Sequence, residues 1–191
     1  MKTVNKADLL QHLESSVEQH IETAIKVFQN LEEEVLLQPA GDGGWSIAQC
    51  LAHLNSYGDY YLPRLKASFA NQPPTTTSTT YKSSWLGNKF IQMMDPATSR
   101  TKYKAAKRHQ PPQVPDAQAV VSEFIRQQEE LLLLLHQAEC ADLTKNAIPV
   151  SILKWLWLKP GDVLQFLVAH NQRHMLQAKR NLPLVYKSSK L

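Results

Sequence analysis

Three histidines in two segments of the chain have a spacing that suits metal binding. His170 and His174 lie four residues apart in PGDVLQFLVAHNQRHMLQAKR, and His53 lies in WSIAQCLAHLNSY. Residues four apart on a helix project from the same face, so two imidazoles can approach one atom and a third from a neighbouring helix can join them. Neutral imidazole binds several divalent transition metals. Three protein ligands with one open position are typical of a catalytic metal site.

The histidine pair also continues an apolar stripe. Val163 and Leu167 precede His170 and His174 along one helical face, and Ala178 follows them. An unpaired polar group on a buried face is costly, and a shared metal would satisfy several imidazoles at once. The remaining histidines lack this arrangement, and we expect them at the surface or on helix flanks: His12, His20, His109 and His136.

Four long helices are expected to position these residues. In the first, apolar residues recur every three or four positions from about Asp8 to Leu37. The second begins at Ser46 and contains His53, the third spans about Asp116 to Ala141, and the fourth about Pro160 to Asn181. This pattern predicts an all-α protein, a four-helix bundle with long crossover connections, in which metal sites lie between facing helices.

The start of the second helix is encoded locally. Ser46 and Gln49 form an S-x-x-Q capping box, and Trp45 and Cys50 are placed to form a hydrophobic staple across it. Pro63 is expected to bend this helix or to mark an irregularity near its end.

Two long connections separate the last three helices. In the first, residues 71–80 indicate an exposed loop and residues 84–94 a short helix. Residues 95–115 contain four prolines and indicate an extended segment that packs over a surface or shapes a site. The second connection includes ILKWLWL at residues 152–158, which is ambiguous between a strand and a buried loop.

Composition limits the class of protein. A chain of 191 residues, 43% hydrophobic and 20% charged, predicts one soluble domain over 1–191, with its core at about 5–182 and a loosely ordered tail at 183–191. Six glycines without a GxGxxG or GK[ST] motif oppose a dinucleotide or P-loop design. Two cysteines are too few for a disulfide framework. Lacking a secretory signal or a long apolar run, the chain is expected to be cytoplasmic with no membrane partner.

The small net charge of +4 owes much to one stretch between prolines. We expect a solvated connector there and no nucleic-acid surface, because no aromatic interleaving or nucleic-acid motif accompanies its cations. These are Arg100, Lys102, Lys104, Lys107 and Arg108.

Two segments resemble the signature segments of the DinB/YfiT-like superfamily of bacterial proteins. The first is a W-S-[IV]-x-[EQ]-x-[LIV]-x-H-[LIV] helix start, matched by Trp45, Ser46, Ile47, Gln49, Leu51, His53 and Leu54. The second is an H-x-x-x-H-x-x-Q helix, matched by His170, His174 and Gln177. The resemblance covers almost the whole chain in order and length, and it implies an unusual four-helix bundle that holds a divalent metal through His53, His170 and His174.

The resemblance also implies a kind of chemistry. Characterised relatives include bacillithiol S-transferases and the mycothiol-dependent maleylpyruvate isomerase, in which the metal is thought to present a low-molecular-weight thiol as its thiolate. A bound cation lowers the pKa of a ligating thiol or water, which creates a nucleophile at neutral pH. The leading hypothesis is therefore a metal-dependent transferase or hydrolase acting on a small molecule. The alternative is a non-catalytic metal-binding or stress-related binding protein.

Further residues are candidates for the site. Gln177, one turn after His174, could hydrogen-bond a ligand or a metal-bound water, and equally could be a helix-flank residue. Tyr57 and Tyr60 lie near enough to His53 to line a pocket, although core positions would have the same pattern. Cys50 lies three residues before His53 and could face the cavity, but a buried position in the core is the favoured interpretation for it. Three imidazoles do not distinguish zinc, nickel, iron and manganese.

Trp155 and Trp157 allow three interpretations. They are explained by a homodimer interface, by the wall of a substrate pocket over the metal, or by an ordinary contribution to the core. Arg173 points about 100° away from His174 around the helix, and we expect it at the surface or at an interface.

Overall fold

The computed structural model describes residues 2–70, 72, 78–99, 101 and 103–183. The expected four-helix bundle is confirmed, and its last three long helices begin and end close to where the sequence indicates, whereas the first ends earlier. They are α1 (Lys6–Lys26), α3 (Ile47–Ala70), α5 (Ala117–Glu139) and α6 (Pro160–Arg180). Most of the loop expected at 71–80 lies outside the described residues, as do Arg100, Lys102 and the tail after residue 183.

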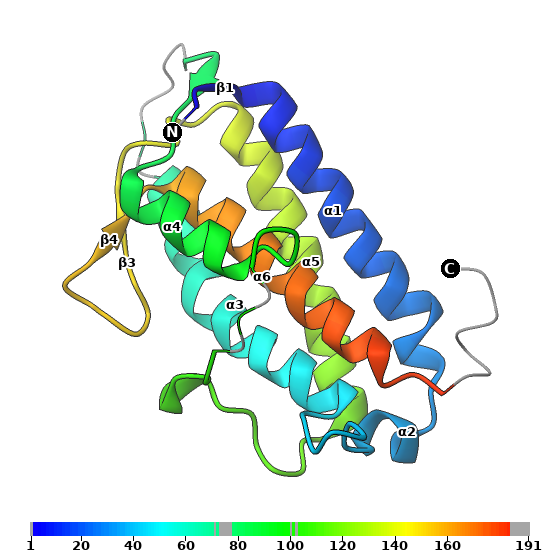
Figure 1. Ribbon diagram of the computed structural model, residues 1–191. Coiled ribbons are helices and arrows are strands. Elements are labelled where there is room, and N and C mark those ends of the chain that lie inside the picture. The colour runs from blue at the N-terminus through cyan, green and yellow to red at the C-terminus, as the bar shows by residue number, and fades with distance from the viewer. Residues whose placement is uncertain (1, 71, 73–77, 100, 102, 184–191) are drawn as a thin grey trace.

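The helices are not arranged in chain order. Both α1 and α3 pack against α5 and α6, and Figure 1 shows that α1 and α6 run in one direction while α3 and α5 run in the other. Because α3 and α5 are parallel, the connection between them returns along the bundle, and it contains α4 (Trp85–Met94). The connection from α5 to α6 stays at one end and contains β3 (Ile148–Pro149) and β4 (Trp157–Leu158), an antiparallel pair. This order places α3 directly beside α6.

The prediction of one continuous first helix is wrong. After α1 the chain forms a short 3-10 helix, η1 (Phe28–Asn30), and then α2 (Glu33–Leu37). The Asn30 side-chain amide donates to the backbone oxygen of Ile25 at 2.8 Å, which ends the helix by engaging one of its last free carbonyls. Phe28 is fully buried beyond that end. The apolar spacing continues through the break, so periodicity alone did not reveal it.

Local capping sets the starts of the other helices. The Gln49 backbone N–H donates to Ser46 Oγ, and the Ser46 N–H donates to Gln49 Oε1, both at 3.1 Å, so the predicted capping box is present. Ser84 and Asp116 cap α4 and α5 with their side chains. Pro63 lies inside α3, and the helix continues past it to Ala70.

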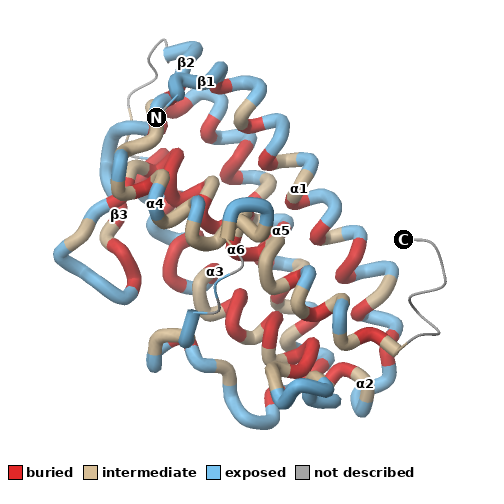
Figure 2. The backbone as a smooth tube through the Cα atoms, in the orientation of Figure 1, coloured by how far each residue is buried: buried red, intermediate tan, exposed pale blue. Residues whose placement is uncertain are grey.

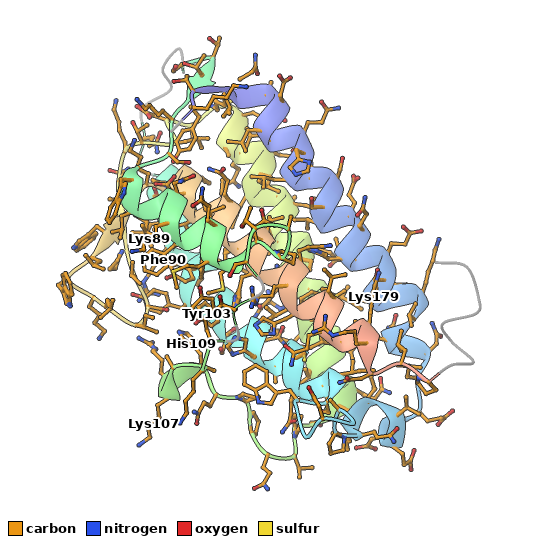
Figure 3. All side chains as sticks on the ribbon, in the orientation of Figure 1. Lys89, Phe90, Tyr103, Lys107, His109 and Lys179 are labelled. Atoms are coloured by element: carbon orange, nitrogen blue, oxygen red, sulfur yellow. The ribbon has the colours of Figure 1, made fainter. Side chains whose placement is uncertain are left out.

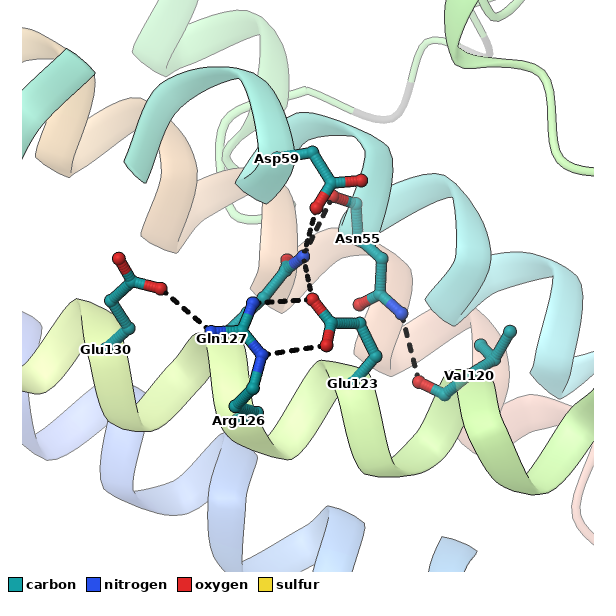
Figure 4. A network of polar contacts seen from close by, with 7 residues as sticks. All are labelled: Asn55, Asp59, Val120, Glu123, Arg126, Gln127 and Glu130. Carbon is teal, nitrogen blue, oxygen red and sulfur yellow. Dashed lines mark hydrogen bonds and ion pairs between the residues drawn. The ribbon is translucent and has the colours of Figure 1, made fainter. Parts of the chain in front are cut away.

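A polar seam joins α3 to α5. Gln127 Nε2 lies 3.2 Å from the backbone oxygen of Asn55, 2.8 Å from Asp59 Oδ1 and 2.8 Å from Glu123 Oε1 (Figure 4). Gln127 is buried, so these acceptors offset the loss of water around its amide. Gly58 makes room for it, because a Cβ at that position would lie 1.8 Å from Gln127 Oε1.

A buried carboxylate holds α4 against the start of α6. Asp162 is 0% exposed and accepts from Tyr81 Oη at 2.8 Å and from Ser84 Oγ at 2.7 Å. A Cβ at Gly87 would lie 2.1 Å from Asp162 Oδ2, so only glycine fits there. Tyr81 belongs to β2 (Thr80–Tyr81), which pairs with β1 (Val4–Asn5). Together these contacts place α4 over α6.

The ambiguous ILKWLWL segment forms a hairpin that leaves its tryptophans outside the core. Val150 and Leu158 are each 2% exposed, whereas Trp155 is 74% and Trp157 57% exposed. The hairpin projects from one side of the bundle, and its tip at residues 152–155 is exposed (Figure 2). A core role for the two tryptophans is therefore wrong. Among the described residues, no helix is both long and apolar enough to cross a membrane.

Candidate metal centre

Three imidazoles meet where α3 packs beside α6. His53 comes from α3, and His170 and His174 come from successive turns of α6. One ring nitrogen from each can be chosen so that all three lie within 4.8 Å of one another. His53 is 3% and His170 2% exposed, and His174 is half-buried. The sequence placed His170 and His174 on one helical face, and the bundle topology brings His53 to them.

Backbone contact fixes the tautomer of His53. Its Nδ1 lies 2.6 Å from the carbonyl oxygen of His109, and a carbonyl can only accept, so Nδ1 carries the proton. The Nε2 of His53 therefore keeps its lone pair, and that lone pair faces the Nε2 of His170 at 3.3 Å. An outer hydrogen bond on one ring nitrogen is the usual way in which a metal-binding imidazole is oriented.

The other two histidines also suit a cation. His174 Nδ1 lies 2.9 Å from Gln177 Oε1, which leaves His174 Nε2 unprotonated when Nδ1 donates. Among the described residues, His170 Nδ1 is buried without a hydrogen-bond partner, so the polar contact of this ring is the one that its Nε2 makes with His53. Nitrogen lone pairs at this separation repel unless a proton or metal ion lies between them. The donor set therefore fits a divalent ion that prefers nitrogen ligands.

Burial keeps these imidazoles neutral. Desolvation lowers the pKa of His174 to about 3, with a smaller contribution from the charge of His53. Desolvation likewise lowers the pKa of His53, and it holds the pKa of His170 well below its ordinary value. A neutral imidazole is the form that binds a metal, so no proton has to be displaced from the binding lone pairs at neutral pH.

Aromatic rings enclose the site on the protein side. The Trp45 ring lies 4.8 Å from His53 and 5.8 Å from His174, and Phe166 stacks on His170 at 5.5 Å, all between ring centroids. On the open side the three histidines line a cavity of about 810 Å³. Its apolar walls come chiefly from α4, α6 and the hairpin and include Phe90, Met93, Met94, Leu158, Phe166 and Leu176.

The weaker candidates separate into two groups. Gln177 and Tyr57 both line the cavity, and the Tyr57 ring lies 4.5 Å from His170 between centroids. Tyr60 does not line it, because its ring is covered by the guanidinium of Arg64 at 3.7 Å. Cys50 is buried in the core, where desolvation raises the pKa of its thiol to about 12. We therefore keep Gln177 and Tyr57 beside the three histidines and leave out Tyr60 and Cys50.

His109 is the residue that the sequence did not reveal. We expected it at the surface, yet it is 2% exposed and its ring stacks on Tyr57 at 3.8 Å between centroids. Ser56 Oγ lies 2.9 Å from His109 Nδ1, and Ser151 Oγ lies 2.9 Å from His109 Nε2 (Figure 3 labels His109). These contacts fix the carbonyl that orients His53. The sequence offered one signal for this position of His109. The four prolines in residues 95–115 indicate a segment that packs over a surface or shapes a site.

Two further expectations about polar side chains are corrected. His20 is 2% exposed, and its Nε2 lies 2.8 Å from Gln172 Oε1 between α1 and α6. Arg173 is half-buried and donates to the backbone oxygens of Met93, Ser99 and Thr101, so it holds the segment after α4 against α6. The expected surface histidines His12 and His136 are exposed.

The described cations of the basic stretch are exposed, as expected for a solvated connector: Lys104, Lys107 and Arg108. Lys104 also lines the cavity. Arg108 Nη1 donates to the backbone oxygen of Ser151 at 2.6 Å, and its guanidinium lies over the Tyr60 ring at 4.9 Å. Arg108 therefore also anchors the segment beside the hairpin.

Fold and site together define a helical-bundle protein with a three-histidine centre open to a cavity. The DinB superfamily model matches residues 16–178, and the chain belongs to that superfamily. Among solved structures, the chain resembles YfiT from Bacillus subtilis, described as a probable metal-dependent hydrolase with an unusual four-helix bundle topology. The TM-score is 0.53 at 15% identity, over 92% of this chain and 85% of YfiT, and this likeness shows the shared fold. Comparison with curated proteins finds no match.

Proposed function

We propose that this protein is a metal-dependent enzyme in which His53, His170 and His174 hold one divalent ion. The observation that carries the proposal is the convergence of three neutral imidazoles, two buried and one half-buried, on the wall of a large cavity. Among the described residues, no fourth histidine, cysteine or carboxylate joins the cluster. Three protein ligands beside a cavity are typical of a catalytic site, whereas a structural site is closed by a fourth ligand.

The chain's own residues prepare this site for a small substrate. A bound divalent ion supplies Lewis acidity and lowers the pKa of a ligating thiol or water. The His109 carbonyl and the Gln177 side chain orient His53 and His174. Trp45 and Phe166 pack beside the imidazoles at the cavity and exclude water from the ring faces that they cover, which strengthens electrostatic interactions there.

Within this class we propose transfer of a small thiol to an electrophilic substrate. Family relatives that use low-molecular-weight thiols support this reaction, and the described residues around the three histidines include no carboxylate in the cluster that would act as a general base. The description of YfiT as a probable metal-dependent hydrolase supports hydrolysis as the second candidate. Both reactions need a nucleophile activated at the metal, and they differ in whether a thiol is consumed. Zinc, nickel, iron and manganese all suit the ligands.

Elemental analysis of tag-free protein tests the metal site. About one divalent ion per chain is expected in the wild type, and His53→Ala and His174→Ala should each lose it. His12→Ala is the matched control, because that imidazole is exposed on α1 and belongs to neither group of the described residues that could hold a metal ion. Absence of metal from wild-type protein, even after reconstitution with each candidate ion, would overturn the proposal and favour a non-catalytic binding protein.

A second assay distinguishes the reactions. The metal-loaded protein is incubated with cysteine and a halogenated electrophile, and separately with an activated ester and no thiol. Thiol-dependent loss of the electrophile that stops with a chelator and in His174→Ala supports thiol transfer. Ester cleavage with the same metal dependence and no need for thiol supports hydrolysis instead.

A further inference from the structure

Three of the four tryptophans of the chain lie exposed at one end of the molecule. Trp85 is 66%, Trp155 74% and Trp157 57% exposed. Trp85 begins α4, and the other two belong to the β3–β4 hairpin. Ile152 and Leu153, at the hairpin tip, are 44% and 37% exposed. Single exposed apolar side chains are ordinary on a protein surface, but a cluster of large ones marks an interaction surface.

Hydrogen bonds hold the two parts of this surface together. Ser84, the residue before Trp85, donates through both its backbone N–H and its Oγ to Asp162, which follows the hairpin by four residues. Lys159 Nζ donates to the backbone oxygen of Lys82 at 3.0 Å. In Figure 1 the first turn of α4 and the hairpin accordingly lie side by side at one edge of the bundle. We call residues 82–89 and 152–159 the tryptophan surface.

The charge of the tryptophan surface has one sign. The segments 78–94 and 146–161 that form it contain no aspartate or glutamate, and their four cations are Lys82, Lys89, Lys154 and Lys159. Lys89 Nζ lies 5.4 Å from the centroid of the Trp85 ring, and Figure 3 shows Lys89 on the outer side of α4. Lysine and tryptophan therefore alternate over the same patch.

Exposed tryptophans together with lysines distinguish between two possible partners of the tryptophan surface, a second copy of the chain and a lipid surface. In a twofold dimer the same patch meets itself, which would bring these lysines against lysines with no acidic partner in either segment. An anionic lipid surface complements both components, because tryptophan rings favour the membrane–water interface and lysines favour acidic headgroups. We propose that the tryptophan surface docks this protein on an anionic phospholipid bilayer.

The contact is peripheral and shallow. Trp155, Ile152 and Leu153 at the hairpin tip enter the interfacial layer, and the lysines bind headgroups beside them. Ile152 also lines the cavity over the histidines, so the docked protein holds its cavity beside the lipid surface. This peripheral contact needs no membrane-spanning segment, and among the described residues no helix is long and apolar enough to be one.

Vesicle sedimentation tests the proposal with the full chain. Wild-type protein should bind phosphatidylcholine vesicles that contain phosphatidylglycerol, and binding should weaken in high salt and with phosphatidylcholine alone. The double variant Trp155→Ser/Trp157→Ser should lower the partition coefficient at least about tenfold, because two rings no longer leave water. Lys154→Ala should lower it about fivefold on the anionic vesicles. Leu133→Ser, at an exposed apolar position on α5, is the matched control and should bind as the wild type.

Two results would overturn the proposal. One is no binding of wild-type protein to the anionic vesicles, or binding that the tryptophan double variant retains. The other is a dimer in sedimentation equilibrium that dissociates in the double variant while vesicle binding is absent, which would assign the surface to a second copy of the chain. Both readouts are independent of metal content, so they do not depend on the proposed enzymatic function.

Discussion

Mild acid is expected to destabilise the metal-free protein by at least about 4 kcal/mol between roughly pH 8 and pH 5. The cause is imidazole burial. His20 and His174, at two separate places, already account for this figure, and burial also lowers the pKa of His53, His109 and His170. Desolvation lowers the pKa of His20 from 6.5 to about 4, and hydrogen bonds to Gln172 and Gln128 offset part of that effect. Desolvation lowers the pKa of His174 to about 3. In the unfolded chain both residues return to an ordinary pKa near 6.5.

The sign follows from where the proton binds. At a pH between the folded and unfolded pKa values, each of these histidines is protonated in the unfolded chain and neutral in the folded protein. Unfolding therefore takes up protons, and the free energy of unfolding decreases as the pH falls. At about pH 5 each histidine costs about 2 kcal/mol of unfolding free energy, because the unfolded pKa lies about 1.5 units above that pH. This figure depends little on the folded value once the folded pKa lies well below 5. The stability is fully present above about pH 7 and is lost as the pH falls toward the folded pKa values.

Urea unfolding at the two pH values, with a chelator present, measures this difference. His20→Gln is expected to remove about 2 kcal/mol of the pH-dependent loss, whatever its effect on stability at pH 8. His12→Gln is the control, because His12 is exposed on the same helix. An unchanged pH dependence in His20→Gln would refute the reasoning, since it would mean that His20 is protonated in the folded protein.

Two further predictions concern packing and cysteine reactivity. Gly58→Ala is expected to cost about 1–3 kcal/mol in urea unfolding, because the new Cβ would lie 1.8 Å from Gln127 Oε1, whereas Gly41→Ala meets nothing within 4 Å and should have a much smaller effect. A cost for Gly58→Ala no larger than for the control would show that α3 and α5 separate easily. A chromogenic disulfide should modify one thiol of the native protein, Cys140, and a second only after denaturation, because Cys50 is buried with a raised pKa. Rapid modification of both thiols in native protein would contradict the burial of Cys50.

The sequence by itself determined what local chemistry controls. A side chain three residues from a backbone N–H caps a helix whatever surrounds it, so Ser46 with Gln49 marked the start of α3 before any packing was known. The same holds for the spacing of His170 and His174, because the pitch of one helix places both on one face. Element type and the placing of His170 and His174 side by side therefore followed from short-range periodicity and capping.

Only the tertiary structure decided the contacts between distant segments. The break after α1 leaves no gap in the apolar spacing, and only the folded protein shows Phe28 buried against other helices beyond it. The His109 carbonyl meets His53 from 56 positions away, so no motif could indicate that an apparent surface residue orients the His53 ring. The chain also could not show that Trp155 and Trp157 stand in solvent, because an apolar residue has the same sequence pattern whether its neighbours are protein, lipid or water. Packing between distant segments depends on the whole fold, so the surroundings of the three histidines could be known only from the tertiary structure.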